Sequence, residues 1–244
     1  MLSLEKGLAV IEAFGQHGGP ATLSRLAEIT GHTRASVRRS LHTLCQLGYA
    51  WQDGRLFHLA ARTLRLGQAY AASNALARLA QPVLESTAEQ TRESASLAVL
   101  DAQDVVFVAR ATLRRSLSAG LGVGARLPAY ASATGRVLLA AQPEPWVRFV
   151  LGRMSRPALT ERTITAVDAI LQEIELVRRQ GHALSDQELE IGLRSVAVPV
   201  RDGRGHTVGA MSLSVSTTRL DVKGIVDTLL PVLERSSARL STLM

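Results

Sequence analysis

The pattern of apolar and polar positions over residues 22–49 predicts two short helices joined by a turn. Apolar side chains recur at helical spacing in both segments, so each predicted helix has one face for a core. Thr22 and Thr33 are suited to cap the two helices, and Gly31 suits the left-handed backbone that ends the first. A short helix, a turn with glycine and a longer helix is the helix-turn-helix pattern.

The second predicted helix divides into an apolar side, with Val37, Leu41 and Leu44, and an outward polar side. Polar and basic side chains on the outward face of such a helix read base edges and bind phosphates in DNA-binding proteins. A solvent-exposed arginine face on an ordinary helical hairpin gives the same pattern. The candidate DNA contacts are Thr22, Thr33, Arg34, Ala35, Ser36, Arg38, Arg39, His42 and Arg55. If Arg39 reads a base, Arg39→Ala is expected to cost roughly 1–3 kcal/mol of DNA binding.

A β-hairpin is predicted directly after these helices. Residues 49–59 read as strand, turn and strand, and the pair Asp53-Gly54 suits the positive φ angles of a tight hairpin turn. Arg55, beside the tip, is placed to reach a phosphate. A helix-turn-helix followed by a hairpin is a winged module, and the two motifs in this order favour DNA binding over the plain helical hairpin.

One more helix is predicted before this module, and a helical connector after it. Leu4, Leu8 and Ile11 repeat at helical spacing until Gly18. Residues 64–91 carry two further helical runs, which form either a rigid connector or a plain linker. We therefore expect a winged helix-turn-helix domain at 1–60, a linker helix at 61–75 and a larger domain at 76–244.

From residue 93 onward the apolar pattern alternates between strand and helix periods. Strands are predicted at 94–100, 105–109, 196–200 and 208–215, and helices at 133–141, 143–152, 167–179 and 221–240. The glycine-rich stretch 115–126 misses the dinucleotide-binding spacing and reads as a strand and loop. Strands joined by turns and interleaved with helices predict an α+β fold, with helices packed on an antiparallel sheet.

Composition narrows the class of protein. No run approaches the roughly 18 uninterrupted apolar residues that a membrane helix needs, and residues 1–14 lack the layout of a signal peptide, so no membrane association is expected. The single cysteine, Cys45, excludes an intramolecular disulfide and a multi-thiolate metal site, and is expected to be a buried structural thiol. These features predict a cytoplasmic protein with no cofactor and no metal.

Basic charge is concentrated in the first third of the chain. Residues 1–80 hold nine basic and four acidic side chains, a net +5 of the formal +7. This asymmetry is typical of a nucleic-acid-binding end joined to a near-neutral body.

A second candidate site lies in the larger domain. Ser212 and Ser214 face the same side of their predicted strand, and Ser195 on the preceding strand can join them. Residues 128–136 lead into a helix start, whose N–H groups attract an anion such as a carboxylate, with Arg136 or Arg126 adding charge. The alternative to a binding site is a solvent-exposed sheet face with small polar residues. The acidic residues Asp186, Glu188 and Glu190 alternate in the sequence. We interpret them by default as solubilising charges on a loop or a strand edge, and a metal site is the minority interpretation.

These segments resemble the IclR-type family of bacterial transcriptional regulators over essentially the whole chain. The resemblance rests on TLSRLAEITGHTRASVRRSLHTLCQLGY, PAYASATGRVLLA, and DQELEIGLRSVAVPVRD followed by GAMSLSVS. The last two look most like the branch that controls aromatic-acid catabolism, namely the protocatechuate, 4-hydroxybenzoate and β-ketoadipate pathway regulators. The resemblance implies a winged DNA-binding domain and a GAF-like effector-binding and oligomerisation domain, working as a homodimer or a dimer of dimers.

The effector pocket of that family matches a specific set of positions here. These are Tyr130, Ala133, Thr134, Ser185, Ser195, Ser212 and Ser214. With their neighbours Gly135, Arg136 and Asp186 they form the candidate effector-binding residues. At Ala133 or Thr134 the branch usually has a bulkier residue, which leaves the shape of the pocket and the identity of the effector open.

The sequence thus predicts a regulator of double-stranded operator DNA whose affinity changes when a small carboxylic acid, aromatic or short-chain, binds the second domain. One alternative is a DNA-binding regulator or architectural protein without an effector. Another is an enzyme, which would need a nucleophile with a base, paired acids or a metal cluster. His182 and His206, the histidines of the second domain, lack metal-ligand spacing, so an enzyme is not expected.

Overall fold

The computed structural model describes residues 2–112 and 122–244. The chain forms two units that divide between Ser73 and Asn74, and each unit is considered by itself. The strand and loop predicted over 115–126 lie mostly outside the described residues.

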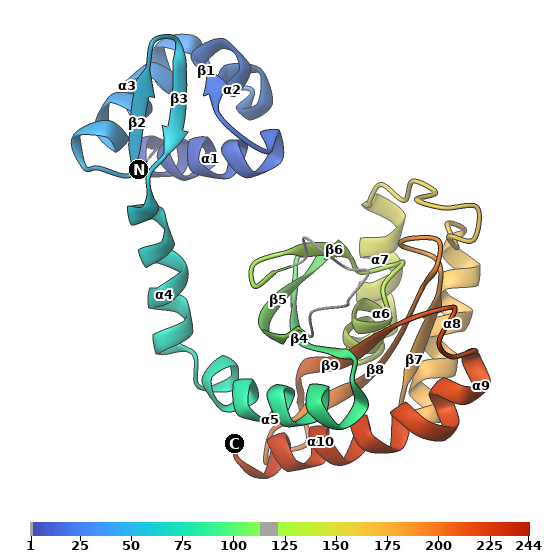
Figure 1. Ribbon diagram of the computed structural model, residues 1–244. Coiled ribbons are helices and arrows are strands. Elements are labelled where there is room, and N and C mark those ends of the chain that lie inside the picture. The colour runs from blue at the N-terminus through green and yellow to red at the C-terminus, as the bar shows by residue number, and fades with distance from the viewer. Residues whose placement is uncertain (1, 113–121) are drawn as a thin grey trace. The chain divides into compact units, whose positions relative to one another are not determined.

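The first unit is a winged helix-turn-helix (Figure 1). Its elements are α1 (Leu2–His17), β1 (Ala21–Thr22), α2 (Leu23–Thr30), α3 (Arg34–Gln46), β2 (Ala50–Asp53), β3 (Leu56–Leu59), the 3-10 turn η1 (Ala61–Thr63) and α4 (Leu64–Ser73). In its small antiparallel sheet, β3 lies between β1 and β2.

The predicted caps and turn of the two central helices are confirmed. The hydroxyl of Thr22 accepts a hydrogen bond from the Arg25 N–H, and that of Thr33 accepts one from the Ser36 N–H. Gly31 ends α2 with a φ of 66°, in the left-handed region that favours glycine. Each helix boundary therefore follows from a local residue choice.

The hairpin that forms the wing is confirmed, but the prediction that the Asp53-Gly54 pair forms its turn is wrong, because Asp53 ends β2 and pairs with Leu56. The two residues between them, Gly54 and Arg55, make the turn, with Gly54 at a φ of 55°. The tip of the wing therefore carries the positive charge of Arg55.

The apolar stripe predicted for α1 is only partly buried. Its core-facing residues are Val10, Ala13 and Phe14, whereas Leu4 is 71% exposed and Leu8 is 47% exposed. Within the described residues of the first unit, the core therefore covers the C-terminal half of α1 and leaves the predicted apolar stripe of its N-terminal half exposed.

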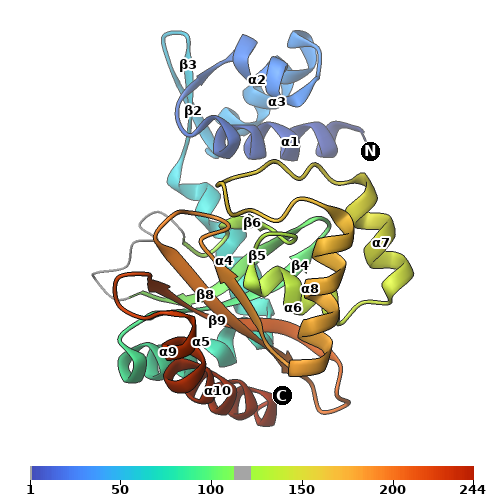
Figure 2. The same ribbon diagram turned by 90° about the vertical axis from the view of Figure 1, so that its right-hand side faces the viewer.

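The second unit is built on a six-stranded antiparallel sheet (Figure 2). The strand order is β6-β5-β4-β9-β8-β7. The strands are β4 (Ser94–Asp101), β5 (Asp104–Ala111), β6 (Arg126–Pro128), β7 (Ala183–Asp186), β8 (Leu193–Arg201) and β9 (Thr207–Ser216).

Helices cover both faces of this sheet (Figures 1 and 2). They are α5 (Ala75–Thr91), α6 (Ala133–Ala140), α7 (Glu144–Arg153), α8 (Val167–Gln180), α9 (Val222–Gly224), the π-helical turn η2 (Ile225–Leu229) and α10 (Leu230–Thr242). α5 and α10 pack on the face that carries Leu97 and Met211, while α6, α7 and α8 pack on the face that carries Ala98 and Ala210. The α+β architecture predicted from the sequence is therefore confirmed.

Some elements differ from the prediction. β7 was not among the predicted strands, yet Ala183–Asp186 pairs with β8 along its full length. β5 runs past the predicted strand end at residue 109 to Ala111, and the final helix is interrupted by the π-helical turn η2. Among the described residues, no helix combines the length and apolar character that a bilayer crossing requires.

Candidate functional site

Basic side chains of α3 and the wing surround one hollow on the first unit. Arg34, Arg38 and His42 follow each other at four-residue spacing, so they share one side of α3. Gln52 and Arg55 from the wing also line the hollow, whose volume is about 610 Å³. The guanidinium of Arg34 is oriented by a hydrogen bond of 2.6 Å to the Ser24 hydroxyl. A concave basic surface beside an exposed helix is suited to bind the phosphates along a DNA groove while the helix enters the groove.

Two of the predicted DNA contacts lie on another side of α3. Ser36, predicted as a DNA contact, is 6% exposed, so its side chain is mostly covered. Arg39 is exposed but lines a groove with residues of α1, including Leu4 and Leu8, and not the hollow beside the wing. The helical period alone did not reveal this, because the position of α1 decides which flank of α3 is covered.

Of the remaining predicted contacts, Ala35 lies on α3 and Thr33 caps that helix, whereas Thr22 caps α2. Ala35 and Thr33 are exposed, and the hydroxyls of Thr22 and Thr33 serve as helix caps. Cys45, expected to be buried, is partly exposed and lines the hollow. Burial raises the pKa of its thiol, which disfavours the nucleophilic thiolate.

A row of serines crosses four neighbouring strands of the second unit. Ser185 on β7 lies opposite Ser195 on β8, Ser195 lies opposite Ser214 on β9, and Ser214 lies opposite Ser94 on β4. Cross-strand partners point to the same face of a sheet. The hydroxyl of Ser185 donates to the Ala131 carbonyl at 3.1 Å, which places the row on the face that α6 covers.

A second polar row runs beside the first. Ser212 on β9 lies opposite Ser96 on β4, and Ser96 lies opposite Arg110 on β5. Ser94, Ser96 and Arg110 were not among the predicted site residues. The alternation Ser94-Ala95-Ser96 has the same form as Ser212-Leu213-Ser214, so the two serines were detectable from the sequence. Arg110 was missed because β5 was predicted to end one residue before it.

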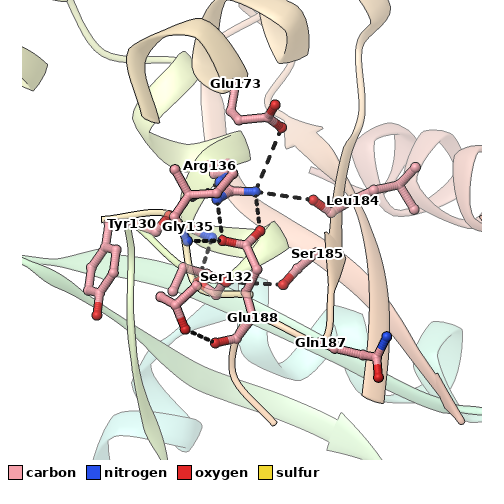
Figure 3. Close-up of polar contacts among 12 residues, drawn as sticks. Tyr130, Ser132, Gly135, Arg136, Glu173, Leu184, Ser185, Gln187 and Glu188 are labelled. Atoms are coloured by element: carbon pink, nitrogen blue, oxygen red, sulfur yellow. Dashed lines mark hydrogen bonds and ion pairs between the residues drawn. The ribbon is translucent and has the colours of Figure 1, made fainter. Parts of the chain in front are cut away.

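The start of α6 faces these rows and is held by side-chain contacts (Figure 3). The Ser132 hydroxyl caps α6 by accepting from the Gly135 N–H at 3.1 Å. Burial raises the pKa of the Tyr130 phenol, which donates to the Pro157 carbonyl at 2.5 Å. Ala133 and Thr134, which follow the cap, are buried. The structure therefore brings the predicted residues of α6 and of the sheet together.

Arg136 does not have the role that the sequence suggested. Its side chain is 1% exposed, and it donates to both carboxylate oxygens of Glu188 at 2.6 and 2.7 Å (Figure 3). It also donates to the carbonyls of Tyr130 and Leu184. Because the Glu188 carboxylate pairs with the Arg136 guanidinium, Arg136 has a structural partner in place of the free charge that the sequence suggested.

Glu188 also holds the segment between α7 and α8. Its carboxylate accepts from the Ile164 N–H at 3.0 Å, and its carbonyl accepts from the Thr163 hydroxyl at 2.6 Å. The Thr160 hydroxyl donates to the carbonyl of the neighbouring Gln187 at 2.7 Å. The acidic loop read as solubilising is therefore a structural junction between α6, this segment and β7.

Asp186 is likewise a structural residue. By strand alternation it points away from the face that carries Ser185, so its side chain does not line the sheet face under α6. Its carboxylate accepts from Arg194 at 2.6 Å and pairs with Arg162 at 3.2 Å. Burial raises the pKa of Asp186, but hydrogen bonds from Arg194 and Gln187 outweigh this, and its pKa lies below the usual value.

Family models match both units of the chain. Residues 68–242 match the family described as bacterial transcriptional regulator IclR, C-terminal, and residues 3–54 match the IclR helix-turn-helix domain. The chain belongs to the IclR family of bacterial transcriptional regulators. As an IclR-family regulator it binds DNA through its first unit and carries an effector-binding domain in its second, and it is not an enzyme.

Two relatives of this IclR-family chain are named as regulators of a Pca regulon and of p-hydroxybenzoate hydroxylase. A Pca regulon regulatory protein of Pseudomonas putida is 42% identical over 97% of this chain and 82% of that protein. A p-hydroxybenzoate hydroxylase transcriptional activator of Acinetobacter baylyi is 36% identical over 99% of this chain and 91% of that protein. The predicted family and its aromatic-catabolism branch are therefore confirmed.

Solved structures agree with the fold. The putative transcriptional regulator RHA06195 of Rhodococcus sp. RHA1 superposes with a TM-score of 0.86 at 41% identity, covering 99% of this chain and 97% of that one. The inducer-binding domain of a PobR double mutant from Acinetobacter, solved as a complex with 3-hydroxybenzoic acid, has a TM-score of 0.66 at 32% identity. That match covers 70% of this chain and 100% of the domain.

Proposed function

We propose that this regulator binds operator DNA as a homodimer and that an aromatic carboxylic acid, bound between the start of α6 and the sheet, changes its affinity for the operator. The observation that carries the proposal is the row of four serines, contributed by four strands, on the sheet face under α6. Hydroxyl groups on an otherwise apolar surface suit a small aromatic ligand with polar substituents. The aromatic-acid ligand and pathways of the relatives support the same chemistry.

Effector binding is tested by thermal unfolding and operator binding measured with and without 4-hydroxybenzoate, protocatechuate and short aliphatic acids. We expect at least one aromatic acid to raise the unfolding temperature and to change the operator Kd by roughly 5- to 150-fold, the usual range of allosteric coupling. Footprinting upstream of the protein's own gene supplies the operator. If no acid shifts either quantity, the alternative of a DNA-binding protein without an effector is favoured.

For DNA, the proposal assigns base contacts to Arg34, Arg38 and His42 and a phosphate contact to Arg55. These are exposed side chains of the hollow between α3 and the wing. An arginine in the major groove recognises guanine through paired hydrogen bonds, whereas a wing arginine gains mainly electrostatic attraction to the backbone. The cytoplasm, where the operator lies, is the compartment that this function requires.

Arg38→Ala is expected to weaken operator binding by roughly 1–3 kcal/mol and to relax sequence specificity, because a base contact is lost. Arg39→Ala is the matched variant, since Arg39 is also exposed on the same helix but lines the groove beside α1. We expect it to cost less. Fluorescence anisotropy with operator and scrambled duplexes at two salt concentrations measures both effects. An Arg39→Ala loss larger than that of Arg38→Ala would restore the assignment made from the sequence.

The dimer is proposed because the first unit leaves an apolar surface uncovered. Leu2, Leu4, Leu8 and Leu47 are exposed around a groove of about 770 Å³ between α1 and α3. Contiguous exposed apolar residues of this kind mark protein interfaces. A twofold dimer places two α3 helices on half-sites about one helical turn apart, roughly 34–36 Å. A dimer of dimers extends the same arrangement, and the molar mass in solution tests both.

A further inference from the structure

An exposed aromatic surface lies on α7 of the second unit. The chain has only two tryptophans, three tyrosines and four phenylalanines, yet Trp146 and Phe149 lie three residues apart on this one helix, 38% and 58% exposed. The guanidinium carbon of Arg153 lies over the Phe149 ring, 4.8 Å from its centre. Aromatic residues and arginine are enriched at protein interfaces and contribute most of their binding energy. These three side chains, here called the α7 surface, therefore have the composition of an interface.

The packing of α7 holds this surface away from the core. Val147 and Leu151, on the opposite side of the helix, are buried in the same core cluster as α6 and α8. Arg148, on a flank of α7, pairs with Asp168 in the first turn of α8 at 3.5 Å. Figure 2 shows α7 beside α8 at the edge of the second unit. The helix is therefore fixed on its inner side and presents the α7 surface on its outer side.

The order of residues along α7 makes this surface complementary to itself. From the helical period, Trp146 and Arg153 lie on one flank of Phe149, rotated from it by roughly 60° and 40°, the first before it in the chain and the second after it. When two copies pack antiparallel about a twofold axis at Phe149, Trp146 of each therefore faces Arg153 of the other. The other flank carries Pro145 and Gly152, and a Cβ at Gly152 would meet no atom within 4 Å, so a second helix can approach closely.

Charge favours the antiparallel direction. The face of a tryptophan ring attracts a guanidinium, so each Arg153 gains a contact with the ring of the other copy while it stays over its own Phe149. The acidic Glu144 lies in the first turn of α7 and the basic Arg153 in the last, so antiparallel packing also brings opposite charges together at both ends. A parallel pair would instead place Arg153 beside Arg153, and these like charges repel.

We propose that the α7 surface is a second self-association site, at which another copy of this chain packs antiparallel through Trp146, Phe149 and Arg153. A second copy is favoured over an unrelated protein because each group of the surface has its complement on the same surface. This inference rests on the proposed function for the size of the assembly. The groove between α1 and α3 forms the dimer, and α7 joins two such dimers into a tetramer.

The molar mass of the full chain, measured by light scattering over a range of concentrations, tests this surface. We expect wild type to be a tetramer and Phe149→Asp to be a dimer, because the variant places two carboxylates against each other at the twofold axis. The Kd for association of two dimers should rise at least roughly thirtyfold, the effect of losing one interface hot spot. Phe149 is exposed, so the variant should fold and unfold as wild type does.

Arg153→Gln and Arg148→Gln are a matched pair on the same helix. Both arginines are exposed, but Arg148 pairs with Glu144 and Asp168 on the flank of α7 beside α8. Arg153→Gln removes two cation–π contacts from each interface and should raise the association Kd roughly 5- to 30-fold, whereas Arg148→Gln should change it by less than about twofold. Equal effects of the two variants would overturn the contact assigned to Arg153.

The measured masses separate this inference from the proposed function. A wild-type tetramer that Phe149→Asp leaves intact overturns the α7 pairing and leaves the proposed dimer in place. A wild-type dimer that Phe149→Asp converts to monomers supports the α7 pairing and overturns the dimer proposed for the first unit. A wild-type dimer that Phe149→Asp leaves unchanged overturns the α7 pairing alone, and a wild type that is monomeric at every concentration overturns both.

Discussion

Replacing Arg136 with methionine is expected to lower the free energy of unfolding of the second unit by about 3–5 kcal/mol. Methionine keeps much of the volume of the arginine stem but removes the two hydrogen bonds to Glu188. The Glu188 carboxylate, 5% exposed, is then left buried without its counter-charge. Urea unfolding measures this. The chain has two tryptophans, Trp51 in the first unit and Trp146 in the second, so a Trp51→Phe background reports the second unit alone.

Two further variants show whether the loss comes from the buried charge. Arg126→Met removes an arginine that also contacts two carboxylates, of Asp101 and Asp104, but whose side chain is about half exposed. It should cost less than about 1 kcal/mol, because solvent screens such pairs. Removing both members of the buried pair, with Glu188→Leu added to Arg136→Met, should recover part of the loss. A loss of less than about 1 kcal/mol for Arg136→Met alone would contradict the structural role given to this pair.

The features of the fold that were predicted from the sequence are those determined by neighbouring residues. The caps Thr22 and Thr33, the left-handed Gly31 and the hairpin turn at Gly54 act within a few residues, and all were predicted. The exposed Leu4 and Leu8 on α1 were not foreseen, because helical periodicity identifies an apolar stripe but not what covers it. Among the described residues of the first unit, nothing covers part of that stripe, which is consistent with the proposed dimer.

In the candidate site, too, local patterns were predicted and long-range contacts were not. The serines Ser212 and Ser214 were found from alternation, and the equivalent alternation at Ser94 and Ser96 carried the same information. Arg136 was misjudged because its partner Glu188 lies 52 residues away in the sequence. Without that partner, an arginine beside a helix start reads as a candidate anion site. Long-range pairing, which periodicity does not encode, therefore decides which charges remain available to a ligand.

Gly135→Ala is expected to destabilise the second unit by about 3 kcal/mol and to weaken the binding of any aromatic acid that protects wild type. A Cβ at this position would lie 2.6 Å from the carbonyl carbon of Ala129 and closer still to its oxygen and Cα. These are backbone atoms of the segment that leads into α6, so the clash is not relieved by a side-chain rotation, and α6 has to move. Because Ala133 and Thr134 begin that helix, its displacement alters the surface that faces the serine rows.

Gly152→Ala in α7 is the matched control, since a Cβ there meets no atom within 4 Å. Alanine is the better helix former, so this variant should be unchanged or more stable by about 0.5–1 kcal/mol. The same Trp146 signal and isothermal titration with 4-hydroxybenzoate measure both variants. If Gly135→Ala behaved like Gly152→Ala, α6 would tolerate a shift without cost, and its close packing on Ala129 would not determine the geometry of the effector site. We expect instead that Gly135→Ala lowers both stability and ligand affinity whereas Gly152→Ala lowers neither, because the contact of Gly135 with the Ala129 backbone determines both.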